Sequence, residues 1–287
     1  MNIQEKNTLN SIEMNGQEIT FDIHGDADGP VILLLSGWAQ DHRLFKHIVE
    51  PLSKRHKVLR MNYRGHTDPL TFPEDFGPSD QADDIIGVLD ALNIKQVIPV
   101  STSHGGWANM EITDRLGIER IPQTIVIDWI MIEATGEFVK SLQDIRNPNT
   151  WFQARRDLFN HWIGISDNKD VKDHLDIEMA SWGFDMWERS CRRIEEAYNY
   201  WSSPLKRMKA LEEKRPIVHI YSQAAVEGYE DIQQKFADEN PWFDFKVIKG
   251  DTHFPTLESP DAVVDRINEF VAAHSLVSNR ADRKGIM

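Results

Sequence analysis

Short apolar segments alternate with amphipathic segments along most of this sequence, and the alternation limits the class of fold that it can adopt. The segment VILLLSG (31–37) is apolar at successive positions, as expected for a strand buried on both faces of a sheet. The same reasoning predicts further strands at 57–65, 96–103, 124–129, 216–223 and 243–250. Apolar residues at helical spacing predict helices at 79–93, 104–117, 229–240 and 260–274. This order indicates the α/β class, with a mostly parallel central sheet and helices on both faces.

Two parts of the sequence depart from this alternation. Near the start, two alternating runs flank Asn15-Gly16, a residue pair favoured in tight hairpin turns, and so predict an antiparallel hairpin. The segment 131–209 contains no clear strand and is rich in Trp, Phe, Arg and Glu at helical spacing. We interpret it as an inserted helical cap over the carboxyl ends of the strands, where ligands bind in open α/β sheets. The core would then consist of 1–130 and 210–287, and the polar tail at 275–287 is expected to fray.

Charge and composition argue against several kinds of partner. The 287 residues include 46 acidic and 32 basic ones, a formal net charge of −14. Such a surface repels phosphate backbones and anionic headgroups, so neither nucleic acid nor a membrane is an expected partner. The single cysteine, Cys191, provides no disulfide framework and no cysteine-rich metal site. The start has no apolar signal core, so we expect a cytoplasmic protein. We also expect a monomer or a weak homodimer.

The stretch STSHGGW joins a predicted strand to a predicted helix. Its frame, Ser101-x-Ser103-x-Gly105, matches a nucleophile elbow in which serine replaces the usual first glycine. The sharp turn of an elbow exposes the serine hydroxyl, and small neighbours allow the backbone to bend. The alternative is that Ser103 is only the N-cap residue of the following helix.

A histidine and two backbone donors complete the pattern that surrounds this serine in α/β hydrolases. His253, in KGDTHFP, follows the last predicted strand by a few residues, and no other histidine has that placement. Gly37-Trp38 lies in the loop expected to donate one backbone N–H to an oxyanion site, and His104 would donate the other. The alternatives are that His253 is an ordinary loop histidine, that Gly37 only allows a turn, and that Trp38 packs in the core. No histidine pair has the spacing of a helical metal motif, so no metal is predicted.

The acidic partner of His253 is displaced from its usual position. Hydrolases usually carry it just after the strand that follows the cap, and here that place holds Ser222 and Gln223, which cannot orient a histidinium by charge. Glu227 is a possible substitute, although it lies late in the segment. Asp128 ends the otherwise apolar run IVID, where a carboxylate needs a partner. We therefore predict that Asp128 pairs with His253, with a helix N-cap or cap-anchoring role as the alternative.

At this point the chain resembles a known family, the cofactor-free 2,4-dioxygenases of 3-hydroxy-4(1H)-quinolones, which have the α/β-hydrolase fold. The resemblance runs over almost the whole chain. It is carried by the stretches LLLSGWAQDHRLFK, NYRGH, VSTSHGGW, IVIDW, SPLKRM, HIYSQ, PWF and THFP. The family also keeps its acid on the IDW strand, in agreement with the choice of Asp128. Some of its members act on 2-alkyl-3-hydroxy-4(1H)-quinolones, which include a bacterial quorum-sensing signal, so quorum quenching is an implied role.

The resemblance also implies roles for individual residues. His253 would be the base, Asp128 its orienting partner, and Ser103 a hydrogen-bond donor that orients the substrate. Four further residues would border the substrate or its oxyanion site, the last of them from the cap: Trp38, His104, Gln40 and Trp162.

The implied reaction needs no metal, flavin or other cofactor, because the substrate supplies the electrons. His253 would remove the proton of the 3-hydroxyl, and the anion would react with O2 to give carbon monoxide and an N-acylanthranilate. The implied partners are therefore a small aromatic N-heterocycle and O2.

Two other functions remain open from the residues themselves. One is a serine esterase or hydrolase that uses Ser103, His253 and an acid, and the other is a non-catalytic ligand receptor on the same scaffold.

Overall fold

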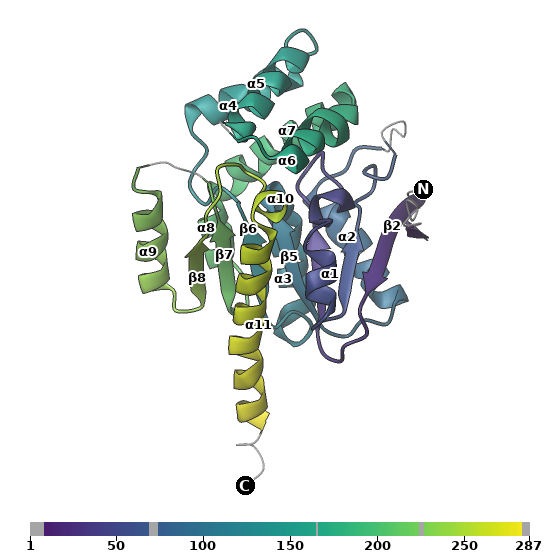
Figure 1. The fold of residues 1–287 in the computed structure, drawn as a ribbon, viewed down its shortest axis with the longest axis vertical. Helices are drawn as coiled ribbons and strands as arrows, with labels where there is room; N and C mark the ends of the chain where they lie inside the picture. Colours follow the sequence, from purple (N-terminus) through teal and green to yellow (C-terminus); the bar gives the residue numbers. More distant parts are fainter. Residues whose placement is uncertain (1–8, 69–73, 165, 224–226, 283–287) are drawn as a thin grey trace.

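The structure is a computed structural model that describes residues 9–68, 74–164, 166–223 and 227–282. Its centre is an eight-stranded sheet in the order β1-β2-β4-β3-β5-β6-β7-β8 (Figure 1). β2 pairs antiparallel with β1 and with β4, and all other neighbouring strands are parallel, which confirms the predicted mostly parallel sheet. The strands are β1 (Asn10–Met14), β2 (Gln17–His24), β3 (Val31–Leu35), β4 (Val58–Met61), β5 (Val97–Thr102), β6 (Thr124–Ile127), β7 (Ile217–Tyr221) and β8 (Phe243–Val247).

The antiparallel edge begins with the predicted hairpin. Asn15 has a φ of +51° and Gly16 a φ of +74°, and Met14 pairs with Gln17 on either side of them. A tight turn of type I′ requires positive φ at both central residues, which asparagine and glycine tolerate better than other residues.

Helices cover both faces of the sheet. Alternate side chains of β3 point to opposite faces, so Ile32 and Leu34 belong to one apolar cluster and Leu33 and Leu35 to the other. In Figure 1, α1 and α11 lie in front of the sheet, and their apolar side chains join the first cluster, whereas those of α2 join the second. The helices outside the segment between β6 and β7 are α1 (Val49–Ser53), α2 (Pro78–Ala91), α3 (Gly106–Arg120), α9 (Tyr229–Glu239), α10 (Pro255–Glu258) and α11 (Pro260–Asp282), with the short 3-10 turns η1 (His42–Phe45) and η2 (Ser103–Gly105).

The segment between β6 and β7 contains helices joined by loops, and no strand among its described residues. Most of its helices lie above the carboxyl ends of the strands, in the upper part of Figure 1. Its last helix, α8, lies lower, where Arg207 donates to the carbonyl oxygen of Met110 in α3 at 2.9 Å. The division into core and cap at residues 130 and 209 stays a prediction. The helical elements are α4 (Gly136–Arg146), α5 (Trp151–Ile163), α6 (Lys169–Asp173), the π-helical turn η3 (His174–Glu178), the 3-10 turn η4 (Met179–Ser181), α7 (Phe184–Trp201) and α8 (Pro204–Lys209).

The end of the chain differs from the sequence-based expectation. The last helix was predicted over 260–274 with a frayed tail, but α11 continues to Asp282. The added segment SLVSNRAD contains neither glycine nor proline, so it carries none of the usual signals that end a helix. Residues 283–287 of the predicted tail lie outside the described part of the chain.

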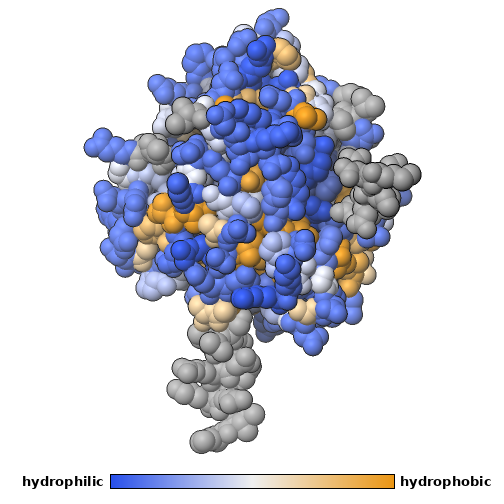
Figure 2. Space-filling view, in the orientation of Figure 1, coloured by the Kyte–Doolittle hydropathy of each residue, from blue (hydrophilic) through white to orange (hydrophobic). Residues whose placement is uncertain are grey.

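The surface is mostly hydrophilic on the face shown in Figure 2, with small apolar patches between charged side chains. The acidic excess of the sequence agrees with such a surface. No helix in the described part of the chain combines the length and the apolar character needed to cross a membrane.

Candidate active site

Ser103 lies in the sharp turn between β5 and α3. Its φ is +48°, in the left-handed region that residues with a β-carbon adopt rarely. Two glycines make the turn possible, because a β-carbon at Gly105 would lie 2.2 Å from the carbonyl oxygen of Ser36, and one at Gly106 would lie 2.3 Å from the Trp129 ring. The strand, turn and helix therefore have the geometry of an elbow, with Ser103 at its apex.

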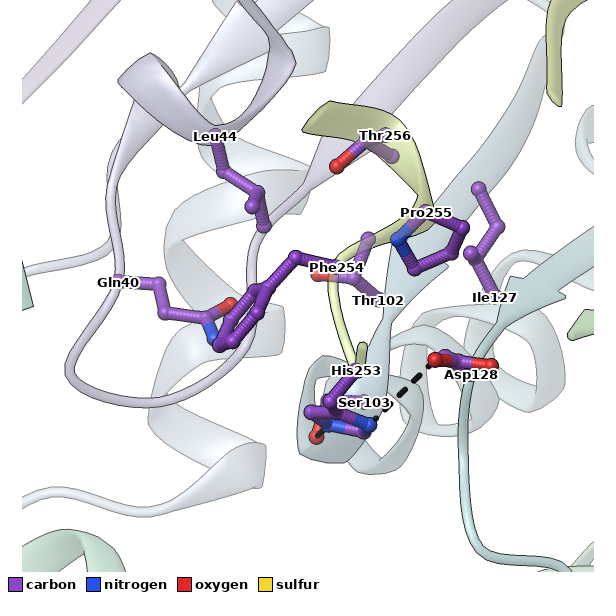
Figure 3. Close-up of a pocket in the computed structure, with 10 residues that line it drawn as sticks. All are labelled: Gln40, Leu44, Thr102, Ser103, Ile127, Asp128, His253, Phe254, Pro255 and Thr256. Carbon is purple, nitrogen blue, oxygen red and sulfur yellow. Dashed lines mark hydrogen bonds and ion pairs between the residues drawn. The ribbon is translucent and has the colours of Figure 1, made fainter. Parts of the chain in front are cut away.

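His253 lies between Ser103 and Asp128 (Figure 3). Its Nε2 is 2.9 Å from Ser103 Oγ, and its Nδ1 is 3.5 Å from Asp128 Oδ2. The three side chains come from the loop after β8, the turn after β5 and the tip of β6. Asp128 is 1% exposed and His253 11% exposed at the side chain, so the pair is shielded from water. An imidazole held in this way can exchange a proton at Nε2 while the carboxylate faces Nδ1.

Asp128 is held by the residues that occupy the usual position of the acid. The backbone N–H groups of Ser222 and Gln223 both donate to Asp128 Oδ1, at 2.8 and 3.1 Å. The Ser222 hydroxyl lies 3.3 Å from Oδ2 and 3.0 Å from the carbonyl oxygen of Thr252, so its one proton serves either acceptor. These donors satisfy a carboxylate that would otherwise be buried without partners. The substitute considered above, Glu227, is exposed.

The loop after β3 lies against the elbow. A β-carbon at Gly37 would be 3.4 Å from Ser103 Cβ, which shows how closely the loop approaches the serine. The Gly37 N–H donates to Gln40 Oε1 at 3.0 Å, so this N–H group already has an acceptor within the protein. The donors predicted for the oxyanion site are then the next backbone N–H group, of Trp38, and that of His104.

The indole of Trp38 packs with other rings. It is 5% exposed and stacks on Phe76, with ring centroids 5.7 Å apart and an interplanar angle of 18°. The His66 ring lies edge-on to it at 6.5 Å. The packed indole considered as an alternative therefore describes this side chain, and only the backbone of Trp38 remains for the predicted oxyanion site.

Aromatic side chains from the cap pack on two histidine rings of the predicted site, that of the predicted base and that of His104. Trp162 of α5 stacks on His253, with centroids 5.4 Å apart and an interplanar angle of 20°. His104 stacks on Phe138 of α4 at 5.8 Å, and Tyr198 of α7 lies edge-on to it at 5.9 Å. Burial lowers the pKa of His104 to about 3, and the nearby His253 adds to this shift, so the His104 ring is neutral near pH 7. The cap thus shields the site with rings that carry no charge.

A cavity of about 10 Å³ lies beside the three predicted catalytic side chains and the neighbouring loops, as Figure 3 shows. This volume is roughly that of one water-sized sphere, so a bicyclic ring enters only if the cap or the loops shift. Among the described residues, no three His, Cys, Asp or Glu side chains are grouped so that they could hold a metal ion. The lining combines polar and apolar groups: Gln40, Leu44, Thr102, Ser103, Ile127, Asp128, His253, Phe254, Pro255 and Thr256.

Known proteins of similar sequence decide the family. A model described as the alpha/beta hydrolase family matches residues 32–266. The 1H-3-hydroxy-4-oxoquinoline 2,4-dioxygenase of Pseudomonas putida is 41% identical over 92% of this chain and 100% of its own length. The 2-heptyl-3-hydroxy-4(1H)-quinolone dioxygenase of Mycobacteroides abscessus is 39% identical over 90% of this chain and 96% of its own length. The chain belongs to the 3-hydroxy-4-quinolone dioxygenases of the α/β-hydrolase family.

Solved structures of quinolone dioxygenases have the same fold as this chain. An AqdC variant that cleaves the ring of the Pseudomonas quinolone signal, in complex with its substrate, superimposes with a TM-score of 0.90. Its sequence is 38% identical, and the match covers 93% of this chain and 100% of that one. At this level of identity, the α/β-hydrolase fold expected from the sequence is confirmed.

Sequence reasoning on this quinolone dioxygenase missed part of the cavity wall. Three lining residues follow His253 directly, and one precedes Asp128, so adjacency to the predicted catalytic residues could have indicated them: Phe254, Pro255, Thr256 and Ile127. No signal indicated Leu44, which reaches the cavity from η1. The roles of Ser222 and Gln223 were missed because their backbone groups, rather than their side-chain types, bind Asp128.

Two buried histidines should make this dioxygenase sensitive to acid. Burial lowers the pKa of His66 and of His219 to about 4, and both rings are 0% exposed. In the unfolded chain each histidine has a pKa of about 6.5. Between about pH 6.5 and pH 4, the unfolded chain therefore binds protons at these histidines and the folded chain does not, so acid favours unfolding. We expect the free energy of unfolding to fall between these limits, by up to about 1.4 kcal/mol per pH unit for each histidine.

Urea unfolding at pH 7, 6 and 5 measures this loss. In His66→Gln the free energy of unfolding should depend less steeply on pH than in the wild type, by up to the equivalent of one proton. A wild-type free energy of unfolding that stays constant over this range would contradict the prediction.

Proposed function

We propose that this protein is a cofactor-independent, ring-cleaving 2,4-dioxygenase of 3-hydroxy-4(1H)-quinolones, with or without a 2-alkyl chain. The observation that carries the proposal is the position of His253, 2.9 Å from Ser103 and 3.5 Å from an acid on β6. The relatives that share most of the chain are named as dioxygenases of such substrates. The reaction consumes O2 and yields carbon monoxide and an N-acylanthranilate.

The first step is removal of the proton of the 3-hydroxyl by His253. With its proton on Nδ1, toward Asp128, the ring presents the Nε2 lone pair to the cavity. After the transfer, the imidazolium is stabilised by the buried carboxylate. Trp162 limits the tilt of the imidazole by stacking on its face at 5.4 Å. The protein thereby supplies a fixed base in a site shielded from water.

The resulting anion is electron-rich and reduces O2 directly. One oxygen atom adds at C2, and the peroxide that forms attacks the C4 carbonyl to close an endoperoxide. When this ring opens, the two atoms of O2 stay at C2 and C4, and C3 leaves with its own oxygen as carbon monoxide. The products are an acyl group on nitrogen and a carboxylate, so the atoms balance without an external reductant.

The other residues of the site orient the substrate. The Ser103 hydroxyl donates a hydrogen bond to a substrate oxygen, and the backbone N–H groups of Trp38 and His104 face the charge that develops at C4. Gln40 lies in the cavity wall, where its amide is held by the Gly37 N–H. Once the substrate is bound, these dipoles already face it, so little reorganisation accompanies the chemical step.

Turnover with and without oxygen tests the proposal. Purified protein freed of metal ions is mixed with a 3-hydroxy-4(1H)-quinolone in air and under nitrogen, and ring absorbance, O2 uptake and carbon monoxide are followed. We expect ring loss only in air, with one carbon monoxide released for each O2 consumed. A series of 2-substituents from hydrogen to nonyl then defines the preferred chain length. Ring loss without O2, or loss that requires added iron or flavin, would refute the proposal.

The second candidate function is a serine esterase, because the contact of 2.9 Å between Ser103 and His253 is also the geometry of an acylating serine. Ser103→Ala separates the two functions. In the dioxygenase the hydroxyl only donates a hydrogen bond, so we expect kcat to fall about 10-fold. In an esterase the hydroxyl becomes covalent, and its loss abolishes turnover.

The assays for this variant are dioxygenase kinetics and hydrolysis of a nitrophenyl ester. Ser101→Ala is the matched control, since Ser101 is a buried serine two residues away that accepts from Asn109 at 2.9 Å. Its kcat should stay within about 2-fold of wild type. Near-complete loss of activity in Ser103→Ala, together with an acyl-enzyme in the mass spectrum of the wild type, would establish the esterase instead.

A further inference from the structure

The backbone turns sharply at the predicted acid. Asp128 has a φ of +46°, in the left-handed region, directly after the four buried residues of β6. Its own N–H still donates to the carbonyl oxygen of Ile220 in the β7 ladder, at 2.9 Å. The next amide, of Trp129, has left the ladder and needs another acceptor because it is buried.

That acceptor is the side chain of His219, which comes from β7. The Trp129 N–H lies 3.3 Å from His219 Nε2. On its other side, His219 Nδ1 lies 2.5 Å from Oε1 of Gln233 in α9. An amide oxygen can only accept, so Nδ1 carries the proton and Nε2 keeps its lone pair for the Trp129 N–H. The contact with Gln233 therefore selects the tautomer that the turn requires.

The environment of His219 keeps it in this neutral form. The ring is 0% exposed and stacks on Tyr221 at 4.8 Å with an interplanar angle of 10°. Burial lowers the pKa of His219 to about 4, although the Gln233 contact and the Asp128 charge oppose this shift. A neutral imidazole with one donor and one acceptor is thus built into the sheet beside the turn.

A second side chain fixes the same turn further along. The Tyr229 hydroxyl of α9 donates to the carbonyl oxygen of Trp129 and accepts from the Met131 N–H, both at 3.0 Å. The turn after Asp128 is therefore held by side chains of β7 and α9, the two elements that follow the cap. The same strand ends at Ser222, whose backbone N–H holds the Asp128 carboxylate.

We propose that His219, oriented by Gln233, is a positioning residue that fixes the Asp128 turn and so aims its carboxylate at His253. This role rests on the proposed function, in which His253 is the base. His219 is not among the residues that line the cavity, and its ring binds the backbone N–H of Trp129, next to Asp128. This role gives a reason for a buried histidine on β7 when the acid follows β6.

Two substitutions of His219 separate positioning from simple packing. His219→Phe keeps a ring of similar size against Tyr221 but leaves the Trp129 N–H without an acceptor. His219→Gln can place an amide oxygen near the position of Nε2 and so restore the acceptor. We expect kcat to fall about 10- to 100-fold in His219→Phe with KM within about 3-fold of wild type, and to stay within about 5-fold of wild type in His219→Gln.

A turnover-independent measurement accompanies the kinetics. In crystal structures of the two variants, the separation of Asp128 Oδ2 from His253 Nδ1 should stay near 3.5 Å in His219→Gln and change in His219→Phe. If His219→Phe fails to fold, Gln233→Met takes its place, because it removes the group that selects the tautomer while retaining an unbranched side chain. It should lower kcat with little change in KM.

The outcomes distinguish this inference from the proposed function. Wild-type kcat in folded His219→Phe or Gln233→Met, or equal losses in His219→Phe and His219→Gln, would overturn the positioning role. If the wild type itself shows no oxygen-dependent turnover, the proposed function fails, and the crystal structures alone then decide whether His219 positions Asp128. An unchanged Asp128 in His219→Phe would refute the role in that case.

Discussion

Replacing His253 with alanine should lower kcat by about 10³-fold or more, because the variant lacks the base that we propose generates the substrate anion. Steady-state O2 uptake and carbon monoxide release measure the loss. Substrate affinity, measured under nitrogen, should change far less, since the ring of the substrate is also held by other groups of the cavity. The large effect on kcat with a small effect on binding is the signature of a group that acts in the chemical step.

His56→Ala is the matched control for this variant. His56 precedes β4 at the amino ends of the strands, opposite the site, and its Nε2 lies 2.8 Å from Asn268 Oδ1. Its kcat should remain within about 2-fold of wild type. Retention of more than about a tenth of wild-type kcat in folded His253→Ala would show that another group removes the proton.

The second large effect is expected for Asp128→Ala, with a loss of about 10²-fold in kcat, between those of His253→Ala and Ser103→Ala. In the proposed reaction the carboxylate stabilises the imidazolium that forms when His253 accepts the proton, and it selects the proton position on Nδ1. Its removal also leaves the backbone N–H groups of Ser222 and Gln223 without their acceptor.

Asp128→Asn separates charge from hydrogen bonding. Asparagine keeps an oxygen that accepts from the two backbone donors but has no charge to stabilise the imidazolium. We expect both variants to show a clear loss of kcat, and the thermal stability of Asp128→Asn to lie closer to that of the wild type. If Asp128→Ala matched the wild type in kcat, the acid would have to be sought elsewhere, and Glu227, exposed in this structure, would be examined first.

The sequence was sufficient for features that depend on neighbouring residues along the chain. The apolar run of β3, the turn at Asn15-Gly16 and the strand–turn–helix context of Ser103 are local patterns with a physical reason for each residue type. The pairing of Asp128 with a histidine could be predicted because a carboxylate at the end of an apolar strand requires a partner. His253 could be predicted from its place after the last strand.

The features that could not be predicted depend on contacts between distant segments. The stacking of Trp162 on His253 joins a cap helix to a core loop, and the hydrogen bond from the Trp129 N–H to His219 joins two strands on either side of the cap. Backbone donors such as the Ser222 N–H exist in every sequence, so only the fold shows which one meets Asp128. For Trp38, spacing placed the backbone near the serine but gave no direction for the indole.

The central claim is that one imidazole ionises the bound ring, after which the organic molecule itself reduces O2. Anaerobic titration of a 3-hydroxy-4(1H)-quinolone into wild type and His253→Ala, followed by the absorbance of the bound ring, tests it most directly. We predict that the wild type binds the anion at a pH where the free quinolone is neutral, and that His253→Ala binds the neutral form. A neutral quinolone in the wild-type complex, or the same anion spectrum in both proteins, would contradict the account.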